Sequence, residues 1–183
     1  NTIFLEADMR LQGSGAENTI IDGFFGNDAD SVIVVSGARE PGASATQINN
    51  LTVTGGTNNA GSGGGIRNEG NLIINNSVIL DHEAATTGGG IANIRLEESS
   101  SPEDGTLVIN NSVILENQSG ADGGGISNEG GSLTINASII NGNVSEDDGG
   151  GVDNNDDGGT VTIRNSTIAN NTADFDGGGV ENG

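Results

Sequence analysis

The most regular feature of the chain is a short alternation of apolar and polar residues that returns about every 25 residues. In four successive units, two apolar residues at alternate positions are followed five residues later by an isoleucine: Leu72/Ile74 with Ile79, Leu107/Ile109 with Ile114, Leu133/Ile135 with Ile140, and Val161/Ile163 with Ile168. Period-2 alternation of this kind predicts strands, and the polar and glycine residues between them keep each strand short. No stretch has the 3.6-residue apolar period of an amphipathic helix.

Glycine triplets mark the start of each unit and give the repeat its length. They begin at Gly63, Gly88, Gly123, Gly149 and Gly177, which are 25, 35, 26 and 28 residues apart. Each triplet is followed by Ile or Val, a variable residue and then Asn. The longest spacing predicts one inserted loop, residues 94–105, within an otherwise constant repeat.

Three short strands in about 25 residues cannot bury their apolar sides alone, but coiling pairs each strand with its equivalent one turn later. The sequence therefore predicts an all-β, right-handed parallel β-helix with three-strand rungs, about seven rungs in all. We expect a single domain, 1–183, in which 1–47 is less regular and 48–183 follows the repeat. Earlier rungs are predicted around these pairs: Ile3/Leu5, Met9/Leu11, Ile20/Ile21 and Val32/Val34.

Recurrent asparagines are expected to form hydrogen-bonded ladders between rungs, because amide side chains stacked in register can pair with one another. One predicted ladder runs through Asn68, Asn93, Asn128, Asn154 and Asn182, and a second column holds Asn117, Asn143 and Asn171. His82 occupies that second column, so we interpret it as a substitute for Asn and not as a catalytic group. Asn117 and Asn143 also lie in glycosylation sequons, where we expect a structural role.

The charge of the chain limits its partners. Five Arg residues and 26 acidic residues give a net charge of −21, and there is no lysine. Such a surface repels nucleic acids and anionic membranes, so neither nucleic-acid binding nor membrane insertion is expected. Two interpretations remain open: an acidic extracellular surface, or the composition typical of proteins from salt-loving organisms.

Acidic residues gather just before and after the later glycine triplets. The candidate metal ligands are Asp122, Asp147, Asp148, Asp153, Asp156, Asp157, Asp174 and Asp176. Like charges stacked at rung spacing repel, and a hard cation with oxygen ligands, such as Ca²⁺, would relieve this. The alternative is a solvated acidic edge with diffuse counterions. No other cofactor is expected.

The combination of Gly-Gly-Gly-Ile/Val-x-Asn with Leu-x-Ile-x-Asn-Ser-x-Ile-x-x-Asn resembles the pectin-lyase-like β-helix repeats of bacterial and archaeal surface proteins. It is also similar to the repeats of chlamydial polymorphic outer-membrane proteins, although a third glycine replaces their alanine and Ile114 replaces the Phe of their second motif. The resemblance implies the β-helix fold and, for function, display or adhesion at a cell surface.

The function expected from the sequence is that of a secreted or cell-surface structural solenoid: a stalk, an adhesin module or a filament subunit. The ends of the chain read as one continuous repeat, because Val180–Gly183 followed by Asn1–Leu5 parallels Ile66–Ile74. Head-to-tail self-association is therefore expected; the alternative is that the sequence is a slice of a longer β-helix. The host or matrix ligand stays open.

The enzymatic alternative is a polysaccharide lyase or hydrolase, or a viral tailspike-type β-helix. Arg67, Arg95 and Arg164 are dispersed over different units, and Trp and Tyr are absent, so the usual platforms for sugar stacking are missing. We therefore name no catalytic residue. Two or three carboxylates converging in a groove would favour the enzyme.

Overall fold

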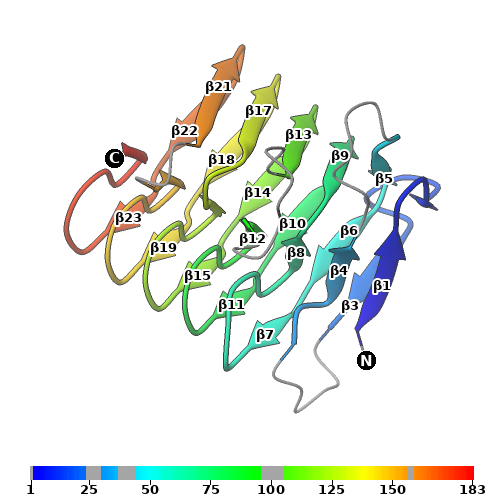
Figure 1. Cartoon of the computed structure of the whole chain (residues 1–183), viewed down its shortest axis with the longest axis horizontal. Coiled ribbons are helices and arrows are strands. Elements are labelled where there is room, and N and C mark those ends of the chain that lie inside the picture. The colour runs from blue at the N-terminus through cyan, green and yellow to red at the C-terminus, as the bar shows by residue number, and fades with distance from the viewer. Residues whose placement is uncertain (1, 24–29, 37–43, 96–104, 156–158) are drawn as a thin grey trace.

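The computed structural model is a right-handed parallel β-solenoid of about six turns, which confirms the predicted fold class (Figure 1). It describes residues 2–23, 30–36, 44–95, 105–155 and 159–183, which contain strands and turns without helix. Accordingly, the described residues offer no helix of the length and apolarity required to span a membrane.

Four parallel sheets run along the solenoid, and each takes at most one strand from a turn. Sheet A comprises β1 (Ile3–Glu6), β4 (Ile33–Ser36), β8 (Ile66–Asn68), β12 (Ile91–Asn93), β16 (Ile126–Asn128), β20 (Val152–Asn154) and β24 (Val180–Asn182). Sheet B comprises β2 (Arg10–Gln12), β5 (Thr46–Asn49), β9 (Asn71–Asn75), β13 (Thr106–Asn110), β17 (Ser132–Asn136) and β21 (Thr160–Arg164).

Sheet C comprises β3 (Ile20–Asp22), β6 (Thr52–Thr54), β10 (Val78–Leu80), β14 (Val113–Leu115), β18 (Ile139–Asn141) and β22 (Thr167–Ala169). Sheet D comprises β7 (Thr57–Asn58), β11 (Glu83–Ala84), β15 (Gln118–Ser119), β19 (Val144–Ser145) and β23 (Thr172–Ala173). The complete turns thus have four strands, which corrects the prediction of three. The strands of sheet D have only two residues each, too few for an alternation to show in the sequence.

The core is a set of apolar columns that repeat in register from turn to turn. Leu107 and Ile109 pair with Leu72 and Ile74 below and with Leu133 and Ile135 above. All six side chains are completely buried, as are the isoleucines at the centre of β10, β14 and β18. The predicted inward positions of residues 72–140 are therefore confirmed.

One early rung has its register shifted by one residue from the predicted pair Val32/Val34. Ile33 and Val35 are completely buried, whereas Val34 is only partly buried. The cause is local: four apolar residues follow one another from Val32 to Val35, so alternation does not identify the inward pair.

The Asn-Ser pairs of the repeat build the corner between sheets B and C. Asn76, Asn111, Ala137 and Asn165 have φ between 47° and 51°, a left-handed conformation that Asn adopts more readily than most residues. The serine that follows links successive turns by hydrogen bonds at this corner. Ser112 Oγ accepts a bond from the Ser77 amide at 3.2 Å and donates to the Asn110 carbonyl at 2.8 Å.

Each glycine of a triplet is required for a different reason. The first has positive φ, as at Gly88 (65°). The second lies against the backbone of the next turn, so that a Cβ on Gly89 would be 2.5 Å from the Gly124 carbonyl oxygen. The third makes room for a buried side chain, because a Cβ on Gly90 would be 2.9 Å from Asn117 Nδ2.

Asparagine ladders link the turns, as predicted. Asn68 Nδ2 donates to Asn93 Oδ1 at 2.7 Å, and the bond recurs between successive turns as far as Asn182. In the second column Asn117 bonds to Asn143, and Asn143 to Asn171, both at 2.9 Å.

A third ladder, which was not predicted from the sequence, lies on sheet B. In it Asn136 donates to Asn110, Asn110 to Asn75, and Asn75 to Asn49, at 2.8–3.0 Å.

The predicted inserted loop falls largely outside the described residues, which resume at Gly105. At the start of the loop, the Ile94 amide donates to the Asn68 carbonyl at 2.9 Å, so the pairing of sheet A continues just past β12. The single-domain assignment and its internal boundaries stay predictions.

Candidate functional site

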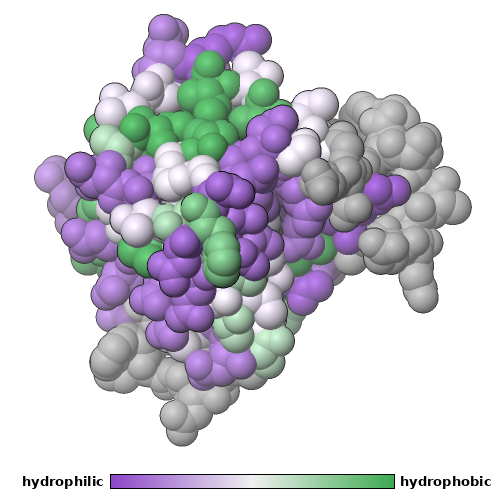
Figure 2. All heavy atoms as spheres, turned by 90° about the vertical axis from the view of Figure 1, so that its left-hand side faces the viewer, coloured by the Kyte–Doolittle hydropathy of each residue, from purple (hydrophilic) through white to green (hydrophobic). Residues whose placement is uncertain are grey.

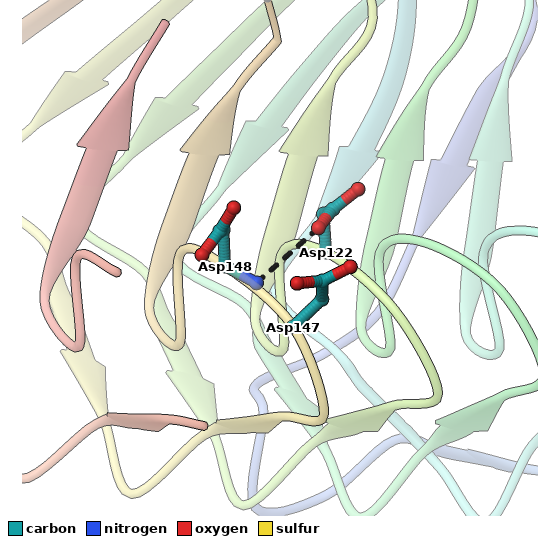
Figure 3. Close-up of side chains that lie close together, drawn as sticks. All are labelled: Asp122, Asp147 and Asp148. Atoms are coloured by element: carbon teal, nitrogen blue, oxygen red, sulfur yellow. Dashed lines mark hydrogen bonds between the residues drawn. The ribbon is translucent and has the colours of Figure 1, made fainter. Parts of the chain in front are cut away.

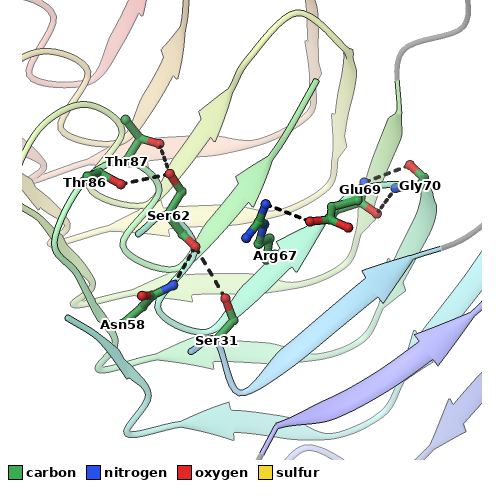
Figure 4. Close-up of polar contacts among 9 residues, drawn as sticks. Ser31, Asn58, Ser62, Arg67, Glu69, Gly70, Thr86 and Thr87 are labelled. Atoms are coloured by element: carbon green, nitrogen blue, oxygen red, sulfur yellow. Dashed lines mark hydrogen bonds and ion pairs between the residues drawn. The ribbon is translucent and has the colours of Figure 1, made fainter. Parts of the chain in front are cut away.

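The residue immediately before each glycine triplet forms a column along one edge of the solenoid, and its chemistry changes along the rod. The column contains Ser62, Thr87, Asp122, Asp148 and Asp176. In the earlier turns the side chains bond to one another: Thr87 Oγ1 donates to Ser62 Oγ at 2.9 Å (Figure 4). Ser62 also contacts Thr86 Oγ1 at 2.9 Å.

The later turns replace these hydroxyl groups with carboxylates, which have no proton to donate. Asp148 Oδ1 accepts a bond from the Asp176 amide at 2.7 Å, and Asp122 Oδ1 accepts one from the Asp148 amide at 3.2 Å (Figure 3). Each carboxylate is thereby fixed by the backbone of the next turn. Stacking like charges in this way requires protons or cations for compensation.

Asp122, Asp147 and Asp148 converge on one point, with one carboxylate oxygen from each lying within 4.8 Å of the others. Asp147 is exposed, whereas Asp122 and Asp148 are partly buried. The pKa of the Asp147 carboxyl is raised, first by desolvation and then by the charges of Asp122 and Asp148. The three oxygens are hard ligands of the kind that Ca²⁺ prefers, although three fall short of a full coordination shell.

Beside this cluster is a polar hollow of about 190 Å³. Its lining residues are Asp122, Asp148, Asp153, Asn155, Glu181 and Gly183. Asp153 is 4% exposed, and burial, followed by a hydrogen bond with the Glu181 side chain, raises its pKa to about 8. The Asp153–Glu181 pair therefore binds a proton more tightly than an ordinary carboxyl does.

The structure brings together part of the predicted acidic set. Asp122, Asp147, Asp148 and Asp153 meet at the cluster and hollow, and Asp176 is tied to Asp148 through its amide. Asp174 is exposed and lies outside both groups of residues. Asp156 and Asp157 lie outside the described residues.

Glu181 lines the hollow but was not among the predicted ligands. Asp153 pairs with it in register between β20 and β24. The equivalent positions of earlier turns are Arg67, Ala92 and Ser127, so the column has no constant residue type. The only sequence signal for Glu181 is its position two residues after the last glycine triplet.

The remaining candidates occupy structural positions. Asn117 and Asn143 are buried in their ladder, which confirms the structural interpretation of these two sequons. His82 heads the same ladder, as predicted. Arg67, in β8, forms an ion pair with Glu69 at 2.8 Å (Figure 4).

Comparison with known proteins identifies no relative: no family model, no curated protein and no solved structure matches this chain. The resemblance to β-helix surface proteins therefore extends to the parallel β-helix fold and no further.

Proposed function

We propose that the chain is an extracellular structural solenoid that serves as a surface stalk, an adhesin module or a head-to-tail filament subunit. The observation that carries this proposal is that the same contacts recur in each successive turn. The apolar columns and the Asn ladders use the buried side chains for stacking between turns. Each turn is stabilised by contacts with its neighbours, and this stacking alone builds an extended element.

The last described turn, which contains β21 to β24, exposes apolar side chains whose equivalents are buried in the preceding turn. Ile163 is 36% exposed and Val180 is 39% exposed, although their equivalents in the preceding turn, Ile135 and Val152, are completely buried. Figure 2 views this end of the molecule, and apolar residues gather in its upper part. A further turn laid on this surface would bury these side chains and pair the strand edges.

The test uses Gly179, the third glycine of the last triplet. A Cβ there would meet only Ile168, at 3.7 Å, so Gly179→Ala is compatible with the free chain. A stacked turn would occupy the space that the Asn side chains fill at Gly90 and Gly125, and the substitution would obstruct it.

Light scattering and electron microscopy of the 183-residue chain at high concentration and high salt should show particles that lengthen with concentration. Gly179→Ala should shorten them without lowering the melting temperature of the monomer. High salt is needed because it screens the net charge of −21. A monodisperse monomer under these conditions would contradict end-to-end assembly.

Cation binding by Asp122, Asp147 and Asp148 is a further part of the proposal, and it rests on their convergence within 4.8 Å. Titration calorimetry with Ca²⁺ should show binding to the wild-type chain that Asp148→Asn weakens at least tenfold. Asp174→Asn is the matched control, because that carboxylate is exposed and outside the cluster. If sodium and calcium raise the melting temperature of the chain equally at matched ionic strength, screening of the acidic charges explains the effect without a specific cation site.

A second candidate function, glycoside hydrolysis, is favoured by one observation: Asp153 and neighbouring carboxylates share a hollow. Glycosidases use a protonated carboxyl and a carboxylate that flank the bond to be cleaved. Wild-type chain should then release reducing sugar from a panel of acidic and neutral polysaccharides, and Asp153→Asn should not. Absence of release across the panel by the wild type would reject this candidate.

A further inference from the structure

His82 occupies the place of an asparagine amide in the second ladder and reproduces the two hydrogen bonds of that amide to the backbone. In the later turns Asn117 Nδ2 donates to the Ile79 carbonyl and Asn143 Nδ2 to the Ile114 carbonyl, each at 3.2 Å. His82 Nε2 makes the equivalent bond to the Val53 carbonyl at 3.0 Å. Its Nδ1 takes the role of the amide oxygen and accepts from the Gly56 amide at 2.8 Å.

These two backbone partners determine the tautomer of the ring. A carbonyl oxygen can only accept, so Nε2 carries a hydrogen; a backbone N–H can only donate, so Nδ1 presents its lone pair. An asparagine amide has the same polarity but does not take up a proton in this pH range. The imidazole does, and its one basic nitrogen is the atom that faces Gly56.

The surroundings give the ring little room to reorient. His82 is 3% exposed, and a Cβ on Gly56 or Gly65 would lie 2.8 Å or less from ring atoms. A hollow of about 230 Å³ lies beside His82. The hollow is lined by Gly55, Thr57, Asp81, His82, Glu83, Glu116 and Gln118.

The charged groups around the ring come from its own turn and from the next one. They are Asp81 and Glu83 on either side of His82, and Glu116 in the next turn; the preceding turn presents Gly55, Gly56 and Thr57, which do not titrate. We propose that His82 is an acid-sensitive joint: its protonation breaks the Gly56–His82 bond and loosens the turn of β7 from the turn of β11.

The energetics favour this assignment. Burial lowers the pKa of His82 to about 4, against the opposing effects of the Val53 carbonyl and of the charge on Asp81. In the unfolded chain the ring titrates near 6.5. The folded state resists protonation of His82. The contribution of the neutral ring to folding stability is therefore complete above about pH 6.5 and is lost as the pH falls toward 4.

His82 is the only histidine of the chain, so its ring can be followed alone by NMR. The folded wild-type protein should show the Nε2–H tautomer at about pH 7 and no ring titration between about pH 7 and 5.5. Hydrogen exchange at about pH 5 should be faster at Gly56 than at the equivalent amides His82 and Asn117. A ring that titrates near 6.5 in the folded protein, or that carries its proton on Nδ1, would overturn the proposal.

His82→Asn supplies the matched variant, since it restores the residue found at this position in the later turns. The ratio of folding equilibrium constants, variant over wild type, should rise about 100-fold as the pH falls from 7 to 4 and approach about 300-fold at lower pH, which corresponds to the full shift in pKa. Asn117→His should introduce a second acid-sensitive joint one turn further on. A ratio that stays constant with pH would contradict the joint, whatever the stability of either variant at neutral pH.

Discussion

Gly90 lies directly against Asn117 of the following turn, so close that a Cβ on Gly90 would be 2.9 Å from Asn117 Nδ2 and 2.7 Å from the Gly125 carbonyl oxygen. The same contact recurs between Gly125 and Asn143 and between Gly151 and Asn171. The third glycine and the ladder asparagine are therefore one structural unit, which explains why glycine stands where similar repeats carry alanine.

Gly90→Ala should lower the free energy of unfolding by about 1–3 kcal/mol, because the added methyl group overpacks a backbone-lined site that cannot expand freely. Gly179→Ala is the control, since the equivalent position in the last turn is open and its effect should stay within about 0.5 kcal/mol. Urea unfolding of the monomer measures both. Equal stability of the Gly90→Ala variant and the wild type would show that the turns can separate to accept the methyl group.

Ile135→Asp should abolish cooperative unfolding, because it places a charge in a completely buried column between Ile109 and Ile163. Ile135→Val removes one methylene from the same position and should cost about 1 kcal/mol. Thermal melts followed by circular dichroism distinguish the two. A cooperative melt of the Asp variant near the wild-type temperature would show that the inward assignment is wrong.

Asn128→Asp should destabilise the protein by about 3 kcal/mol or more at neutral pH. Asn128 Nδ2 donates to Asn154 Oδ1 and to the Gly131 carbonyl, and a carboxylate would face both acceptors without a proton while buried. Asn182→Asp tests the exposed end of the same ladder and should cost much less. Similar losses for both variants would mean that the ladder is not the cause.

The raised pKa of Asp153 predicts a pH dependence opposite to that of His82. The folded state keeps the proton of Asp153 up to about pH 8, whereas the unfolded chain loses it near pH 4. The stabilising contribution is therefore complete below about pH 4 and is lost as the pH rises through 8. Chemical unfolding of Asp153→Asn between about pH 5 and 8 should show a flatter profile than the wild type, with Asp174→Asn as control. Parallel profiles would contradict the assignment of the proton to Asp153.

The extent to which the sequence predicts this molecule depends on whether a position repeats. Leu107, Ile109 and Asn128 recur in type at each turn because each fills a column whose neighbours are the same residue, so their roles could be predicted. Glu181 and Asp153 occupy a column that changes type along the rod. Their meeting follows from the register of sheet A, but the residue type in this column does not recur, so the pattern of the repeat did not single out Glu181.

The buried asparagine ladder of sheet A also gives the rod a direction. From Asn68 to Asn182 each amide nitrogen donates toward the C-terminal end, so the side-chain dipoles add and the column terminates in a donor. A turn added at that end must offer an oxygen, and two C-terminal ends brought face to face would oppose donor to donor. An assembly built by continuing this ladder is therefore polar, with two chemically unequal ends.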